Sequence, residues 1–345
     1  MLTLSSYLSR HLDRIPFLSD SLNADILPRM RLLPDSADLP CLEAPNTFTE
    51  RILRARLAQF WRSNRPPRSL EWDVMAAEER YEEFCSSYLA MLPPAYALEP
   101  DKQWDERVPT LPMKRQLLHI ATFELICWNF RPTLTKQPDE IGRLPLYKQI
   151  MIAHAKRALA AAALSLLQSV ADLYKLMGGS RTRFSGIIVP MFEAAVPLLC
   201  LCADQSFPGD PIAEGRAASG RNPSPLCIKI SKVTREVCMQ ATREALDSLE
   251  MLSEVSEVAE VGAQTLARLI SRVDSLPPQS HQGSGATASD GDFDPMAECV
   301  TVGGQGIFPF GNEVSSSSWA DLLGDWTDTF GIQMESVDFT KRGNL

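Results

Sequence analysis

Cysteine is the residue type best suited to metal chemistry in this sequence, and its spacing argues against a metal site. Thiolate zinc sites commonly use pairs of cysteines that are separated by two residues, and no such pair occurs here. Cys200 and Cys202 are separated by one residue inside an apolar segment, where thiols usually fill space in a core. The eight cysteines are Cys41, Cys85, Cys127, Cys200, Cys202, Cys227, Cys238 and Cys299. We therefore predict no metal and no cofactor for this chain.

Catalytic signatures are also missing from the sequence. There is no G-x-S-x-G elbow, no glycine-rich phosphate loop, no H-E-x-x-H pair and no D-D-x-x-D cluster for magnesium and diphosphate. Only four histidines could supply a general base, and they are His11, His119, His154 and His281. His119 lies on the polar stripe of an otherwise apolar segment, which favours a hydrogen-bonded structural histidine over a base. The sequence predicts no enzyme and no catalytic residue.

Charge divides the chain into a body and a tail. The net charge is −9, and residues 273–340 contain many Asp and Glu but no Lys or Arg. The remainder is close to neutral. Residues 276–345 begin with a stretch that is poor in apolar residues and rich in small and acidic ones, so we expect a largely disordered acidic tail.

One short segment of this tail carries the pattern of a helix, near residues 318–330. Its apolar residues share one helical face, and Asp321, Asp325 and Asp328 flank them. The five apolar residues are Trp319, Leu322, Leu323, Trp326 and Phe330. We expect them to bind in a hydrophobic groove of a partner, as amphipathic helices do. Packing of the same helix onto the chain's own core is an equally good interpretation.

We expect the near-neutral body to be built around a central helix, and the segment 109–134 has the pattern of such a helix. Apolar residues cover almost the whole circumference of a helix drawn through it, which requires neighbours on several sides. Pro132 restricts Arg131 away from helical geometry, so we expect the helix to end there. A narrow polar stripe remains and consists of Arg115, His119, Thr122 and Asn129.

Apolar periodicity predicts further helices around this one, and no strand pattern appears before the tail. We expect them at 48–62 with Thr49 as a cap, 74–92, 146–177, 184–203 with a kink, and 229–272 as one or two helices. Loops should connect them at 132–145 and near 204–226, the second being mobile. Glu78 and Lys156 should face away from the core. The fold class is therefore all-α, a multi-helix regulatory bundle over residues 49–275 after an irregular N-terminal segment, 1–48.

Two segments could contact something other than protein, and in both the simpler interpretation is stronger. Residues 187–203 are apolar but contain Glu193 and two prolines, which favours a buried helix over a membrane span. The arginines of 51–68 could contact nucleic acid, but arginine on the wet face of an amphipathic helix is common. The N-terminus lacks the pattern of a secretory leader.

The central segment resembles part of the fungal-specific transcription factor domain, the helical region that follows the zinc binuclear cluster in fungal regulators. The likeness covers roughly residues 50–275. The residues that carry it are Leu117-Leu118-His119, Arg131-Pro132-Thr133-Leu134, Leu92-Pro93-Pro94 and His154-Ala155. The resemblance implies a nuclear transcriptional regulator that controls a metabolic or biosynthetic gene set. Its partners would be a coactivator or another DNA-binding regulator, with the chain as a homodimer or heterodimer.

The sequence departs from that family in one respect. A zinc binuclear cluster needs six cysteines with C-x2-C and C-x6-C spacings, and this chain has no C-x2-C. Direct contact with DNA is therefore left open, as is whether the chain is a truncated form. The alternative interpretation is a non-catalytic helical scaffold or interaction protein without a transcriptional role.

Overall fold

The structure is a computed structural model that describes residues 45, 48–64, 72–136, 138–179, 182–204, 206–208, 230 and 232–275. Every regular element within these residues is a helix, so the predicted all-α class is confirmed there. Most of the N-terminal segment 1–48, most of the loop near 204–226 and the whole of 276–345 lie outside the described residues. The predictions made for those segments stay predictions.

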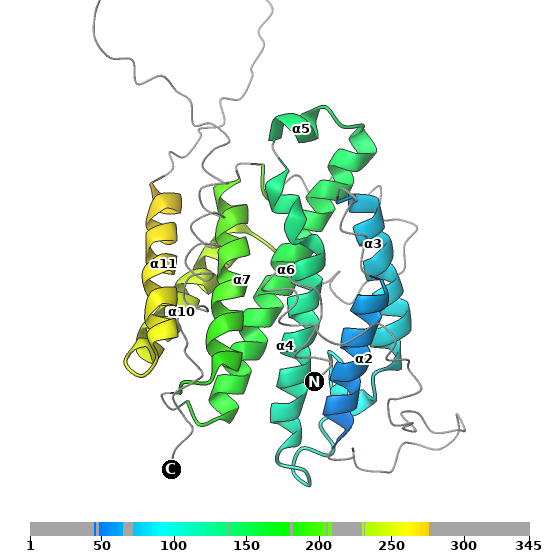
Figure 1. Ribbon diagram of the computed structural model, residues 1–345, viewed down its shortest axis with the longest axis vertical. Coiled ribbons are helices and arrows are strands. Elements are labelled where there is room, and N and C mark those ends of the chain that lie inside the picture. The colour runs from blue at the N-terminus through cyan, green and yellow to red at the C-terminus, as the bar shows by residue number, and fades with distance from the viewer. Residues whose placement is uncertain are drawn as a thin grey trace, which may run out of the picture.

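Long helices with roughly parallel axes form the body (Figure 1). Two of them, α4 (Leu111–Phe130) and α6 (Leu146–Leu176), pack against each other at its centre. On one side, α7 (Ser185–Ala203) covers α6, and α10 (Arg235–Ser253) and α11 (Glu257–Asp274) cover α7. On the other side, α2 (Thr49–Ser63) and α3 (Val74–Glu83) pack on α4. The predicted central helix is thus confirmed, and α6 shares its role.

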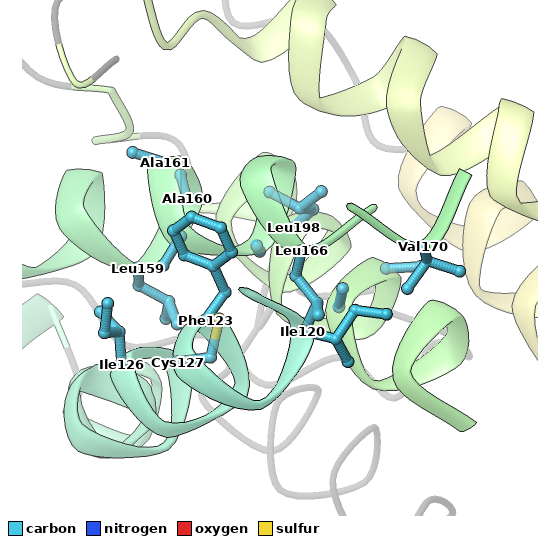
Figure 2. Packing of buried hydrophobic residues seen from close by; sticks show 14 of the residues in the cluster. Ile120, Phe123, Ile126, Cys127, Leu159, Ala160, Ala161, Leu166, Val170 and Leu198 are labelled. Carbon is cyan, nitrogen blue, oxygen red and sulfur yellow. The ribbon is translucent and has the colours of Figure 1, made fainter. Parts of the chain in front are cut away.

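Alanine lets the central helices approach closely. Ala160 to Ala163 of α6 are all buried, and their methyl groups leave room for the larger side chains of α4 and α7. Figure 2 shows this arrangement, with Phe123 and Cys127 of α4 beside Leu159 and Ala160 of α6, and Leu198 of α7 beyond them. Because small and large side chains alternate across this contact, the core is continuous from α4 to α7.

The segment predicted as a single helix over 74–92 changes its winding halfway. After α3 ends at Glu83, residues Phe84–Tyr88 form a π-helix, η2, and Leu89–Met91 form a short 3-10 helix, η3. The wider turn stacks the ring of Phe84 on that of Tyr88, with 5.2 Å between centroids. The Tyr88 hydroxyl donates to the Leu53 carbonyl oxygen at 3.0 Å. Met91, which a regular helix over 74–92 would place on the same face as Tyr88, is instead 47% exposed.

The end of α4 also differs from the prediction. The α-helix stops at Phe130, but Arg131 keeps helical angles and the chain continues as a 3-10 helix, η5 (Arg131–Thr135). Pro132 is tolerated because it sits in the first turn, where an amide hydrogen has no intrahelical partner. Thr133 Oγ1 donates to the Phe130 carbonyl oxygen at 2.7 Å. The expected loop 132–145 additionally contains a short helix, α5 (Pro138–Gly142).

Helix ends are set by a few side chains that the sequence offers at the right places. The side chain of Asp73 caps α3, that of Thr234 caps α10 and that of Ser256 caps α11. Ser256 therefore divides the segment 229–272 into two helices. Thr49, predicted as a cap, is instead the first residue of α2 and is buried, while Phe48 holds the cap position without a side-chain hydrogen bond. At the end of α6, Gly178 and Gly179 adopt positive φ angles, a conformation that commonly ends helices.

Candidate functional site

The predicted partner-binding residues lie outside the described residues. They are Trp319, Leu322, Leu323, Trp326 and Phe330. The structure therefore gives no position for the amphipathic segment of the tail. What the structure does show is how the body uses its own polar groups.

The guanidinium of Arg115, which lies on the polar stripe of α4, makes its hydrogen bonds and its ion pair inside the body. Its Nε donates to the Ala95 carbonyl oxygen at 2.7 Å, and its two terminal nitrogens contact both carboxylate oxygens of Asp105, at 2.7 and 3.2 Å. The side chain is almost completely buried. This two-pronged ion pair holds the segment between η4 (Pro94–Tyr96) and α4 against the helix.

His119 is a structural residue, as the sequence predicted. Its Nε2 lies 3.0 Å from the Ala97 carbonyl oxygen and 3.3 Å from that of Tyr96, and the ring is buried. Because both neighbours are acceptors, Nε2 carries the hydrogen. The ring therefore fastens the same segment as Arg115 does, one turn further along α4.

Asn129 joins α4 to α3. Its amide nitrogen donates to the Ala77 carbonyl oxygen at 2.8 Å, and its amide oxygen accepts from Arg80 Nε at 3.1 Å. Trp72 Nε1 donates to the Asn129 carbonyl oxygen at 3.3 Å. All four residues of the polar stripe are buried, and Arg115, His119 and Asn129 hydrogen-bond to other segments of the body, while the Thr122 hydroxyl makes no hydrogen bond within the described residues.

Two residues expected to face away from the core are buried instead. Lys156 of α6 places its ammonium nitrogen 2.5 Å from the Asp204 carboxylate, just after α7 ends. Burial opposes ionisation of Asp204, but the charge and hydrogen bond of Lys156 hold its pKa below the ordinary value. Glu78 of α3 is also buried, with Oε2 3.6 Å from His154 Nδ1. In both cases the polar residue is paired with a residue that is distant in sequence. The periodicity of a single helix cannot predict such a partner.

Two arginines of α2 contact neighbouring side chains of the body. Arg54 contacts the buried Glu50 at 3.2 Å, and the guanidinium of Arg51 lies 5.8 Å from the centre of the Phe48 ring. These contacts agree with arginines that solvate a helix face. Arg65 and Arg68, which complete the basic run, lie outside the described residues.

The described thiols lie in the core, with the exception of Cys85, which is half-buried. Cys127, Cys200, Cys202 and Cys238 are buried on α4, α7 and α10. Burial raises the pKa of Cys127 far above its ordinary range and that of Cys200 to about 12. Among the described residues, no three His, Cys, Asp or Glu side chains are grouped so that they could hold a metal ion.

Two helices, α6 and α7, are long and apolar enough to cross a membrane by length and composition alone. Most residues in their apolar windows are buried within the bundle by neighbouring helices. Such burial is also what interior helices of a water-soluble bundle show. The prolines Pro190 and Pro197 lie inside α7, which runs through both.

Four of the nine large apolar side chains that are exposed among the described residues lie where successive helices end and begin: Leu176, Phe184, Met251 and Val258. They come from the end of α6, the residue before α7, the end of α10 and the start of α11. Polar contacts hold these parts together, since Tyr174 Oη lies 3.9 Å from Met251 Sδ and Arg183 Nε donates to the Val255 carbonyl oxygen at 2.5 Å.

The described body is all-helical, and several of its polar side chains, among them Arg115, His119 and Asn129, hold its segments together. The chain is similar to known proteins. A Penicillium rubens protein named transcription factor xilB is 42% identical over 290 residues, which is 83% of this chain and 42% of that protein. An Alternaria solani protein named "Probable transcription factor sol4" is 37% identical over 278 residues, which is 79% of this chain and 49% of that protein.

The chain is therefore similar to fungal transcription factors over most of its length, while it spans less than half the length of these two curated relatives. No family model matches the chain, and no solved structure matches it.

Proposed function

We propose that this chain is a fungal transcriptional regulator, related to the regulatory region of the zinc binuclear cluster proteins, and that it acts by recruiting partners. The observation that carries the proposal is the similarity of most of the chain to two proteins named as transcription factors. The helical bundle agrees with it, because Arg115, His119 and Asn129 hold segments of the body together. Since both relatives are named as transcription factors, we assign the chain no catalytic activity and no cofactor.

The acidic segment near 318–330 is the part of the chain that we assign to partner contact. Its apolar face offers two tryptophans and a phenylalanine, which are the side chains that most often dominate binding energy at interfaces. The partner is a transcriptional coactivator or another DNA-binding regulator. The chain works in the nucleus on a metabolic or biosynthetic gene set, as a homodimer or with a second regulator that supplies contact with DNA.

A reporter assay tests this proposal directly. The full chain is fused to a heterologous DNA-binding domain in a fungal host and transcription from a matching promoter is measured. We expect activation, and we expect the triple variant Trp319→Ala, Trp326→Ala, Phe330→Ala to reduce it strongly. Loss of a single interface hot spot costs about 2 kcal/mol or more, or roughly 30-fold in affinity.

A matched control keeps the test specific. Phe308 and Phe310 are aromatic residues of the same tail but lie outside the amphipathic pattern, so the double change to Ala should leave activation intact. If neither the full chain nor residues 276–345 activate transcription, the chain is better described as a helical scaffold. If the triple variant instead lowers the melting temperature of the full chain, the segment packs on its own body.

A further inference from the structure

Two of the core cysteines belong to different helices and face each other. Cys202 lies in the last turn of α7, Cys238 lies in the first turn of α10, and these helices pack side by side. Both residues are completely buried. They are far apart in sequence, and the fold brings them together where one helix ends and the other begins.

Their contacts define a thiol pair. The Cys202 thiol donates to the Arg235 carbonyl oxygen, with 3.7 Å between sulfur and oxygen. Arg235 lies one helical turn before Cys238, so this contact places the Cys202 sulfur against the turn that carries the second thiol. The Cys238 thiol in turn donates a hydrogen bond to the Cys202 sulfur.

This arrangement makes the two thiols unequal. The hydrogen bond from Cys238 lowers the pKa of Cys202 in spite of burial, and the same bond raises the pKa of Cys238. Cys200, two residues away on the same helix, has no such donor, and burial raises its pKa to about 12. Cys202 is therefore the core thiol with the most thiolate character, which is the property that sets reactivity toward oxidants.

Position makes the pair accessible to a small oxidant despite its burial. Both cysteines lie in terminal turns, and helix ends open locally at a lower free energy than helix centres. Cys127 and Cys200 are comparably buried, and burial raises the pKa of both thiols, so they have less thiolate character than Cys202.

We propose that Cys202 and Cys238 are a redox-modification site that a peroxide oxidises to a reversible disulfide. The Cys202 thiolate attacks one oxygen of hydrogen peroxide, the O–O bond breaks, and the products are a sulfenic acid at Cys202 and hydroxide, which takes a proton to become water. The Cys238 sulfur then attacks the sulfenic sulfur, the S–O bond breaks, and a second water leaves with the Cys238 proton. Two thiols are oxidised by two electrons and one peroxide is reduced to two waters.

The disulfide would fasten α7 to α10 and close the chain between residues 202 and 238 into a covalent loop. Such a crosslink restricts the unfolded chain, so the oxidised protein should resist unfolding more than the reduced one. A thiol reductant returns the pair to its original state, so the change is reversible. This inference concerns a response to oxidants and does not depend on the proposed transcriptional role.

The experiment uses the purified, fully reduced full-length chain treated with hydrogen peroxide. We expect the intact mass to fall by about 2 Da, as two thiol hydrogens are lost. Digestion without reduction should link the peptide containing Cys202 to the peptide containing Cys238. The melting temperature should rise by several degrees and return after dithiothreitol.

Matched variants separate this pair from the other thiols. Cys200→Ser and Cys127→Ser should keep both the crosslink and the rise in melting temperature, and Cys200→Ser also assigns the crosslink, because no Lys or Arg separates Cys200 from Cys202. Cys238→Ser should lose both. The proposal is overturned if the oxidised wild-type chain shows no linked peptides, links a different pair, or carries sulfinic acid at Cys202 without a bond to Cys238. The wild-type peptide map decides this even if a serine variant fails to fold.

Discussion

Lys156 Nζ lies 2.5 Å from Asp204 Oδ2, which joins the middle of the long helix α6 to the residue that follows α7. The neighbouring Arg157 donates from Nε to the Pro208 carbonyl oxygen at 2.6 Å, so two adjacent cations of α6 hold the same stretch of chain. Phe207, between the two contacts, is buried. The path of the chain after α7 is thus set by charge on α6 together with apolar packing.

Removing one member of this ion pair should destabilise the body. We expect Asp204→Asn to lower the free energy of unfolding by about 3 kcal/mol, because a nearly buried ammonium would lose its counter-charge. Chemical denaturation of purified protein measures the change. The double variant Lys156→Met, Asp204→Leu should recover much of the loss, and a double variant as unstable as the single one would show that the charge is not the cause.

The same ion pair predicts a dependence of stability on pH. The pKa of Asp204 is lowered in the folded state, so the carboxylate contributes stability above its unfolded pKa, which is near 4. That contribution should disappear as pH falls from about 4 through the folded pKa. Denaturation curves measured between pH 7 and pH 2 should converge for wild type and Asp204→Asn at the acidic end. Curves that stay parallel over this range would contradict the assignment.

His119 should matter for stability. Replacing it by Leu removes the donor for the carbonyl groups of Tyr96 and Ala97, and leaving buried acceptors without a donor costs about 1–3 kcal/mol. Thermal unfolding measures the loss. His154, which is more exposed, provides the comparison, and its replacement by Leu should cost less. Equal losses would show that the His119 contacts are not the source of its effect.

The alanine contact between α4, α6 and α7 should tolerate no larger side chain. Ala161→Leu adds three carbons where the alanine is 1% exposed, and overpacking of this kind costs about 1–3 kcal/mol or more. Ala90, exposed in η3, is the matched control because the same change there meets solvent. Denaturation midpoints of the two variants should therefore differ clearly, with the Ala90 variant close to wild type.

Gly179 is expected to resist substitution for a conformational reason. Its φ angle is +61°, a region that alanine enters at a cost of roughly 1–2 kcal/mol. Gly142 at the end of α5 has no neighbouring atom within 4 Å of an added methyl group and no positive φ. Gly142→Ala should be neutral or slightly stabilising, since it reduces the freedom of the unfolded chain. Melting temperatures of the two variants test the contrast.

The periodicity of apolar residues predicted most of this fold. A helix that is buried on one side repeats apolar residues every three or four positions, and this repeat indicates both its length and its buried face. The central helix and the helical character of 229–272, which was predicted as one or two helices, follow from it. It failed at Met91 and Arg131, where the winding changes to a π-helix or a 3-10 helix without a change in composition. It also misassigned Glu78 and Lys156, because their burial depends on partners that are distant in sequence.

The candidate functional residues could also be predicted only in part from the sequence. Five apolar residues at helical spacing predict a binding face in the tail, but spacing does not say what the face contacts. The pairing of Cys202 with Cys238 has no local signal at all, since it arises only when α7 and α10 pack together. The relation of the chain to transcription factors came from short residue combinations around α4, and the comparison with two relatives supports it.

The polar stripe of α4 has a consequence for how such proteins can diversify. The polar side chains on this stripe, Arg115, His119 and Asn129, form hydrogen bonds inside the body. The central helix α4 therefore exposes few polar groups that could bind another molecule. Differences in what the body recognises must then reside in the peripheral helices and in the flanking chain. Exchange of those outer parts between relatives should therefore transfer recognition, while the inner pair of helices is retained as a shared frame.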